Sequence, residues 1–346
     1  MKLAAGLNYG GDPLAASARA VEAERLGLDM LWVPEGYSFD AVSLLGHIAA
    51  RTERLQLASG ILPIYSRTPA LLASTAAGID ALSAGRFNLG IGASGPQVIE
   101  GWHGVPYDRP LQRTREIIDI CRTVWRRDLL EHDGPAYQVP LPPGAGTGLG
   151  KPLKLINHPV RPRIPIYLAS LGPKNVQLAA ELADGWLPTF FHPDKAAQVW
   201  GPDLAAGASR RDPGLGPLEI AAGGSVCLTS DTALAQQIRD KARPSLALYI
   251  GGMGAKGRNF YNDLFRRYGY EEEAARIQEL YLSGSKREAE ALIPDDYLEA
   301  TTLVGDEGRV KERVQAFRDA GVSILNVQVT GENPLGVVEK LRSWTA

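Results

Sequence analysis

The chain has 346 residues, of which 45% are hydrophobic, enough to bury one large core. Its net charge of -2 and isoelectric point near 6.3 exclude the basic excess typical of proteins that bind nucleic acid or anionic membranes. No apolar run approaches the roughly 20 residues that span a bilayer. We therefore expect neither nucleic acid nor a membrane as a partner.

The N-terminal residues, MKLAAGLNYGGDP, predict a buried strand and not a signal peptide. The two cysteines, Cys121 and Cys227, lie in apolar stretches and are expected to be buried thiols, without a disulfide, as in a reducing cytoplasm. No cluster of His, Cys, Asp and Glu has metal-ligand spacing, so we predict no metal site. The expected location is the cytoplasm.

A local pattern recurs along the chain, in which a helix is followed by a small residue with glycine and then by a short apolar strand. It appears at Glu24–Val33, Leu82–Gly90, Glu181–Leu187 and Arg318–Val329. Glycine suits the end of a helix, where φ is positive, and strands that are apolar on both faces suit a parallel sheet covered by helices. The predicted strands are Leu3–Asn8, Met30–Val33, Leu55–Gly60, Arg86–Ile91, Ile164–Ala169, Gly185–Leu187, Glu219–Leu228 and Ser323–Val329. Eight such units favour a (β/α)8 barrel, formed by residues 1–346 as a single domain.

Two helix starts are marked by an N-cap followed by an early proline, Asp12-Pro13 and Asp108-Arg109-Pro110. Two segments interrupt the repeat. The first, Glu131–Arg163, is rich in proline and glycine and is expected to form an ordered loop or hairpin over the barrel mouth. The second, Pro244–Tyr297, is helical, charged and aromatic, and is expected to form a substrate wall or a partner surface.

The ligand site of such a barrel is built by the loops that follow the strands. Residues 85–110, GRFNLGIGASGPQVIEGWHGVPYDRP, form a strand and a glycine-rich loop, a usual place for catalytic groups in α/β enzymes. The pairs Glu35/Asp40 and Glu100/His103 could each supply an acid or a base. Single loop residues of these types are more often caps or solvated groups, so both interpretations stay open.

Two further strand exits carry distinctive patterns. In YLASLGPKN, residues 167–175, a hydroxyl, free amides at a helix start and a lysine could hold a phosphate. An ordinary capped turn is the alternative. In SGILPIYSRTP, residues 59–69, an apolar strand continues past glycine into a bend, and a bulge there could support a flat ring. A simple loop is the alternative at this second exit.

The segment GRFNLGIGASGPQVIEGWHGVPYDRPLQRTRE resembles the bacterial luciferase-like superfamily, in particular its branch of oxidoreductases that use the deazaflavin coenzyme F420. The same branch is matched, in order, by ILPIYSRTPALLAS, YLASLGPKNVQLAAELADGWLP and ALYIGGMGAKGRNFYNDLFRRYGYE. The resemblance runs from Lys2 to about Thr330. It implies a luciferase-like (β/α)8 barrel, a homodimer, and a hydride carrier bound in the barrel mouth.

The resemblance also implies roles for individual residues. It assigns the cofactor's phosphate to Ser170, Gly172, Pro173 and Lys174. It places a non-prolyl cis peptide bond behind the deazaflavin ring, within Ser59, Gly60 and Ile61, at either the first or the second of their two peptide bonds. Glu35 stands where the family has an acidic residue near the cofactor. The ribityl and ring side is lined by Ser94, Gly95, Pro96, Gln97 and Val98.

One departure from the family pattern concerns the acid–base groups. Relatives that act on alcohols and sugars often have a histidine directly after the Glu35 position, a tryptophan a few residues later and a glutamate near Gly95. This chain has Gly36, Asp40 and Gly95 instead. Those relatives' substrates therefore cannot be transferred to it. The local substitutes that we expect are Tyr37, Asp40, Glu100 and His103.

The expected activity is transfer of a hydride between F420 and a small organic substrate, as a dehydrogenase or reductase. Two alternatives are an FMN-dependent monooxygenase on the same scaffold and a non-catalytic flavin-binding barrel. A phosphate-binding isomerase or aldolase barrel ranks last, because no convincing Schiff-base lysine or Glu/His pair is present. The oligoglutamyl tail of F420 favours exposed basic groups near the mouth, such as Arg67, Lys151, Lys154 or Lys256.

Overall fold

Eight parallel strands close into a barrel in this computed structural model, which describes residues 1–254, 257, 259–331 and 333–346. In barrel order, the strands are β1 (Lys2–Gly6), β2 (Met30–Val33), β3 (Gln56–Ser59), β5 (Phe87–Gly92), β8 (Ile166–Ala169), β9 (Gly185–Leu187), β10 (Glu219–Leu228) and β12 (Ile324–Val329). Pairing of β12 with β1 closes the ring. The predicted (β/α)8 barrel is confirmed, and no predicted strand end differs from the observed one by more than two residues.

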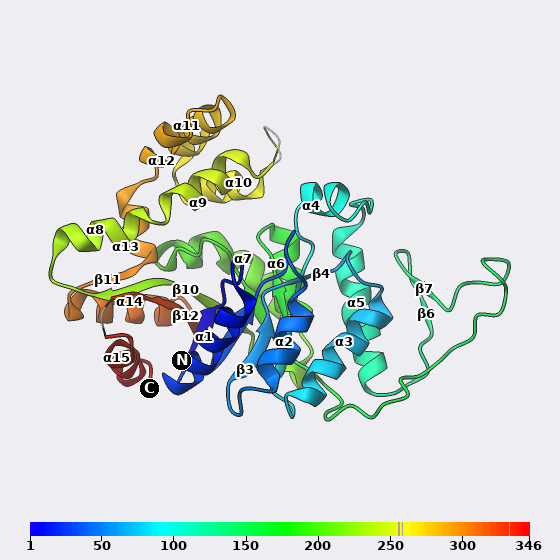
Figure 1. The fold of residues 1–346 in the computed structure, drawn as a ribbon. Helices are drawn as coiled ribbons and strands as arrows, with labels where there is room; N and C mark the ends of the chain where they lie inside the picture. Colours follow the sequence, from blue (N-terminus) through cyan, green and yellow to red (C-terminus); the bar gives the residue numbers. More distant parts are fainter. Residues whose placement is uncertain (255–256, 258, 332) are drawn as a thin grey trace.

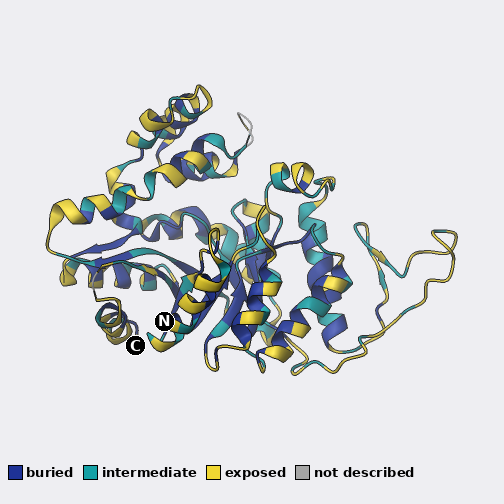
Figure 2. Cartoon of the chain, in the orientation of Figure 1, coloured by how far each residue is buried: buried dark blue, intermediate teal, exposed yellow. Residues whose placement is uncertain are grey.

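Helices surround the barrel, and the strands between them are almost entirely buried (Figures 1 and 2). The outer helices are α1 (Pro13–Arg25), α2 (Ala41–Ala49), α3 (Pro69–Leu82), α5 (Pro110–Trp125), α6 (Pro173–Leu182), α7 (Ala196–Ala208), α14 (Glu307–Asp319) and α15 (Pro334–Thr345). Two short strands join the sheet beside the ring, β4 (Leu62–Pro63) on β5 and β11 (Leu303–Gly305) on β10. All six residues of β5 are buried, because helices cover its outer face and the barrel interior its inner face.

Local details agree with the sequence patterns at most helix ends. Asp12 caps α1 by accepting a hydrogen bond from the amide of Leu14 at 2.8 Å. The prediction that Gly185 ends a helix is wrong, because Gly185 lies within β9. A Cβ there would stand 2.2 Å from the Tyr167 ring, so close packing requires this glycine. The prediction that Asp108 is the N-cap of α5 is also wrong, because Arg109 occupies that position.

Asp108 does not cap α5 because its carboxylate pairs with Arg113, one turn into the helix, at 2.7 Å. Arg109 has a φ of 47°, which turns the chain sharply into α5. A side chain that can cap a helix can therefore be drawn to a cation further along it.

The 131–163 segment contains the expected hairpin, β6 (His132–Asp133) paired with β7 (Gln138–Val139), but the hairpin does not cover the mouth. It packs along the outside of α5, where Glu116 accepts hydrogen bonds from the amides of Ala136 and Tyr137. Figure 1 shows the segment projecting away from the barrel. The reason is topological, because the segment leaves the end of α5 and returns to the start of β8, both opposite the mouth.

The second insertion follows the mouth end of β10 and lies over that side of the barrel (Figure 1). It contains α9 (Arg243–Ala247), a π-helical turn (Leu248–Gly252), α10 (Phe260–Arg267), α11 (Glu271–Leu282), α12 (Lys286–Ala291) and α13 (Asp295–Thr301), after α8 (Thr232–Asp240). The Tyr268 hydroxyl joins it to the β9 exit loop by donating to the Phe190 carbonyl at 3.0 Å. None of the described helices is long and apolar enough to cross a membrane.

Candidate functional site

The backbone after β3 follows a bulged path, one of the two alternatives that the sequence left open. The Gly60–Ile61 peptide bond is cis, the second of the two expected positions. The chain then resumes pairing with β5 through Leu62 and Pro63. The Ser59 hydroxyl donates to the Gly90 carbonyl at 2.8 Å and accepts from the Gly90 amide at 2.9 Å. Ser59 is therefore engaged within the barrel wall, and the backbone of Gly60 and Ile61 is what this exit offers a ligand.

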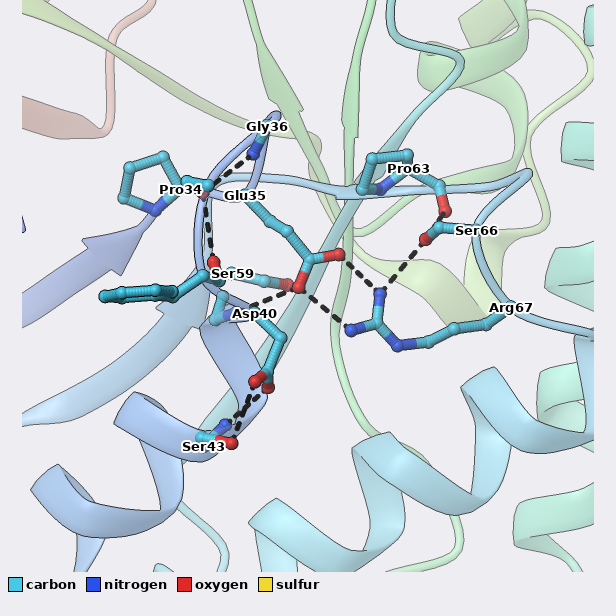
Figure 3. Close-up of polar contacts among 12 residues, drawn as sticks. Pro34, Glu35, Gly36, Asp40, Ser43, Ser59, Pro63, Ser66 and Arg67 are labelled. Atoms are coloured by element: carbon cyan, nitrogen blue, oxygen red, sulfur yellow. Dashed lines mark hydrogen bonds and ion pairs between the residues drawn. The ribbon is translucent and has the colours of Figure 1, made fainter. Parts of the chain in front are cut away.

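Glu35, at the exit of β2, forms a two-pronged ion pair with Arg67 (Figure 3). The Arg67 Nη1 and Nη2 atoms donate to the two carboxylate oxygens at 2.6 and 2.9 Å, and the Ala41 amide donates to one of them at 2.8 Å. The side chains are only 7% and 13% exposed, and the hydrogen bonds to Glu35 raise the pKa of Arg67. The pair fastens the β2 exit loop to the loop before α3. Arg67 is thus not the exposed basic group that we expected for the cofactor tail.

The residues after β5 lie together at the mouth. Ser94 has a φ of 58°, and Gly95 is the N-cap of the short helix α4 (Pro96–Gly101) without a side-chain cap. Gln97 and Val98 follow in its first turn. The Tyr107 hydroxyl donates to the Ser94 carbonyl at 3.4 Å, which holds this loop against the start of α5.

The loop after β8 combines a buried hydroxyl with an open helix start. Ser170 is buried, and among the described residues its Oγ has no hydrogen-bond partner. Gly172 is the N-cap of α6 and supplies no side-chain cap, and a Cβ there would meet nothing within 4 Å. Pro173 and Lys174 form the first turn, with Lys174 exposed. An unsatisfied buried hydroxyl costs about 1–3 kcal/mol, and a phosphate oxygen would satisfy it at a helix end that favours anions. These residues fit the phosphate of a flavin-type cofactor.

The four candidate acid–base residues lie in different environments, and no hydrogen bond in the described part of the chain joins any two of them. Asp40 caps α2 by accepting from the amide and hydroxyl of Ser43, at 2.8 and 2.9 Å. Tyr37 is exposed, and Glu100 accepts from the Tyr107 amide at 3.2 Å. His103 differs, because its Nε2 is buried and has no partner among the described residues.

Sequence reasoning missed a cluster of three rings above the mouth. Phe190, in the β9 exit loop, lies 5.3 and 5.7 Å from the ring centres of Tyr249 and Tyr261, which are 4.7 Å apart. Phe190 has a φ of 56°, an uncommon conformation for a bulky residue. The 244–297 insertion was expected to form a substrate wall or a partner surface, but nothing in the sequence shows that it meets the β9 exit loop.

Of the remaining basic candidates for the cofactor tail, the two lysines that the structure describes are not at the mouth. Lys151 and Lys154 belong to the segment that projects from α5 (Figure 1), and Lys256 lies outside the described residues. No group of three or more His, Cys, Asp or Glu within the described ranges could hold a metal ion.

Two hollows are found in the surface, one at the end of the barrel opposite the mouth and one that begins beside the first turn of α6. A cavity of about 640 Å³ lies at the opposite end of the barrel. There the two carboxylate oxygens of Glu219 accept hydrogen bonds from the Tyr167 hydroxyl and from Lys2. A groove of about 150 Å³ runs between α5 and α6.

Comparison with known proteins adds four findings. The family model of luciferase-like monooxygenases matches residues 1–323. A Mycobacterium tuberculosis protein with the provisional name coenzyme F420-dependent oxidoreductase is 42% identical over 353 residues, covering 100% of this chain and 98% of the relative. The 5,10-methylenetetrahydromethanopterin reductase of Archaeoglobus fulgidus is 29% identical over 92% of this chain and 89% of its own length. The solved coenzyme F420-dependent tetrahydromethanopterin reductase of Methanopyrus kandleri has a TM-score of 0.78 at 21% identity, covering 98% and 96% of the two chains.

Proposed function

The chain belongs to the family of luciferase-like monooxygenases, and within it we propose an oxidoreductase that transfers a hydride between coenzyme F420 and a small organic substrate. The unpartnered Ser170 hydroxyl at the open start of α6 carries this proposal, because it is a ready phosphate site beside a barrel mouth. The F420-dependent relative that matches the full length at 42% identity favours F420 as the cofactor.

Each part of the site has a distinct task in this proposal. When bound, F420 supplies two-electron hydride chemistry. Ser170 and the first turn of α6 would hold its phosphate, and the backbone of Gly60 and Ile61 would support its ring. Ser94 to Val98 would line the opposite side. Hydride transfer needs the two carbons held in contact with water excluded, and the rings of Phe190, Tyr249 and Tyr261 are suited to cover the substrate.

We propose that His103 handles the proton that accompanies hydride transfer. Its buried Nε2 has no partner in the described part of the chain, whereas Asp40 is committed to capping α2. A His103→Gln variant should lose about 10²- to 10⁴-fold in kcat and keep its affinity for F420. His158→Gln, on the projecting segment, is the matched control and should stay active. An unchanged kcat in His103→Gln would remove His103 from this role.

The principal alternative is an FMN-dependent monooxygenase, because a phosphate cradle serves either cofactor. Titration of the purified protein with F420 and with FMN separates the two. A non-catalytic barrel is the other alternative, and turnover of any electrophilic alkene, imine or alcohol in the presence of F420 excludes it.

We further propose a homodimer formed through α2, α3 and the 131–163 segment. Helices α2 and α3 pack together, and their only ionisable side chains are His47 and the buried Asp80. Most of the projecting segment is exposed (Figure 2). Within it, the side chains of Leu149 and Ile156 are 83% and 89% exposed. A second copy of the chain would cover both surfaces. A stable interface buries about 800 Å² on each partner, which calls for an extended surface of this kind.

Light scattering of the purified protein tests the dimer. We expect twice the chain mass for the natural sequence and a shift toward the monomer for a Leu71→Glu/Leu82→Glu variant, which charges the exposed face of α3. A natural sequence that runs as a monomer would contradict the proposal.

We also propose a cytoplasmic protein that acts as one domain on small molecules, without a nucleic-acid partner. Its two cysteines are free and buried, the Tyr268 bond ties the insertion to the barrel, and the isoelectric point is about 6.3.

A further inference from the structure

We infer that the groove between α5 and α6 binds the anionic oligoglutamyl tail of the cofactor, an inference that rests on the proposed use of F420. The groove has a volume of about 150 Å³, and two leucines contribute apolar lining. Its polar lining is Gln112, Arg115, Lys174, Gln177, Glu181 and Arg210.

The charge of the groove suits a polycarboxylate. Arg115, Lys174 and Arg210 outnumber the one lining carboxylate, Glu181, which receives hydrogen bonds from both arginines at 2.8 and 3.0 Å. These bonds lower the pKa of Glu181, so it stays ionised. With three cations and one carboxylate, the lining has a net charge of +2. An arginine has five N–H donors, and each arginine gives one to Glu181. The others, on side chains 40% and 48% exposed, can reach a ligand.

The position of the groove connects it to the phosphate site. Both α5 and α6 begin at the mouth, and Lys174 belongs to the first turn of α6 as well as to the groove. From Lys174 to Glu181 the helix rises about 10 Å, which two or three extended glutamyl units cover. A tail that leaves a phosphate held at Ser170 can therefore enter the groove at its upper end.

Neighbouring carboxylates do not cancel the positive charge of the groove. Asp203 accepts from Gln177 at 3.0 Å and lies 3.6 Å from Arg267, which balances it from outside the groove. Asp119 lies one turn beyond Arg115 on α5, and burial raises the pKa of its carboxyl, an effect that the nearby Arg122 and Arg115 only partly offset.

The test compares two forms of the deazaflavin, one with several glutamates and one that ends at the phospholactyl group. Their dissociation constants are measured by fluorescence titration at low and at high salt, without any substrate. The natural protein should bind the long form about tenfold more tightly at low salt, and added salt should shrink the difference. Arg115→Gln/Arg210→Gln should lose most of this preference and bind the short form unchanged.

Two further variants make the result specific. Arg126→Gln removes an exposed arginine at the C-terminal end of α5, outside the groove, and it should keep the full preference. Glu181→Gln removes the only lining carboxylate and should increase the preference, the opposite sign from the arginine variant. Thermal unfolding of each variant shows that it is folded.

Equal affinity for the two forms in the natural protein would overturn the groove assignment and leave the proposed cofactor standing. A full tail preference in Arg115→Gln/Arg210→Gln would also overturn it. Failure of both forms to bind would remove the proposed cofactor, and with it the groove assignment.

Discussion

Replacing Glu35 by glutamine should remove the charge that Arg67 needs in a nearly dry environment. The pair has two hydrogen bonds of 2.6 and 2.9 Å, and its side chains are 7% and 13% exposed. Breaking a buried pair costs about 3–5 kcal/mol, because the remaining charge has no compensation. Glutamine still offers one oxygen to a donor, so we expect the lower end, about 3 kcal/mol. Urea unfolding followed by circular dichroism measures the loss directly.

Two variants bound the interpretation of this result. Glu22→Gln removes the partner of Arg25, 3.8 Å away with side chains 58% and 75% exposed, and should cost less than about 1 kcal/mol. Glu35→Gln/Arg67→Met removes both charges and should recover much of the stability lost in Glu35→Gln. Equal, small losses in Glu35→Gln and Glu22→Gln would refute the claim that the mouth pair is desolvated.

Three further outcomes are expected. Burial lowers the pKa of His192 to about 4, so the unfolded chain takes up a proton before the folded chain does as the pH falls. The free energy of unfolding should therefore be full above about pH 6.5 and decline by up to about 3 kcal/mol by pH 4. Denaturant titrations across this pH range should show the decline in the natural protein and not in His192→Gln. Gly90→Ala should abolish soluble expression, since its Cβ would lie 1.9 Å from the Ser59 carbonyl oxygen, whereas Gly6→Ala, in another barrel strand with no atom within 4 Å, should change the melting temperature little. Ser170→Ala should leave stability unchanged or higher and weaken F420 binding by about tenfold in a fluorescence titration, and unchanged affinity would exclude a phosphate at Ser170.

The barrel could be predicted because its strands are apolar on both faces and many of its helices end in glycine. Both patterns are local, so strands such as Met30–Val33 and Glu219–Leu228 were placed with their observed bounds. The errors come from side-chain contacts that these local patterns do not reveal. Gly185 is required by the Tyr167 ring, and Asp108 is drawn to Arg113.

The candidate site divides in the same way. A hydroxyl before an open helix start is a local pattern, and Ser170 lies where the sequence suggested, with an unpartnered oxygen. The partner of Glu35 is 32 residues away, and the ring cluster joins Phe190 to Tyr261 across a whole insertion. Such contacts depend on how the loops fold over the mouth, which no spacing in the sequence reveals.

Titration of the purified protein with F420 and, separately, with FMN tests the proposed function most directly. We expect saturable binding of F420, at least tenfold tighter than that of FMN, a difference of about 1.4 kcal/mol or more. Tight binding of FMN with no binding of F420 would contradict the assignment of this barrel mouth to a deazaflavin.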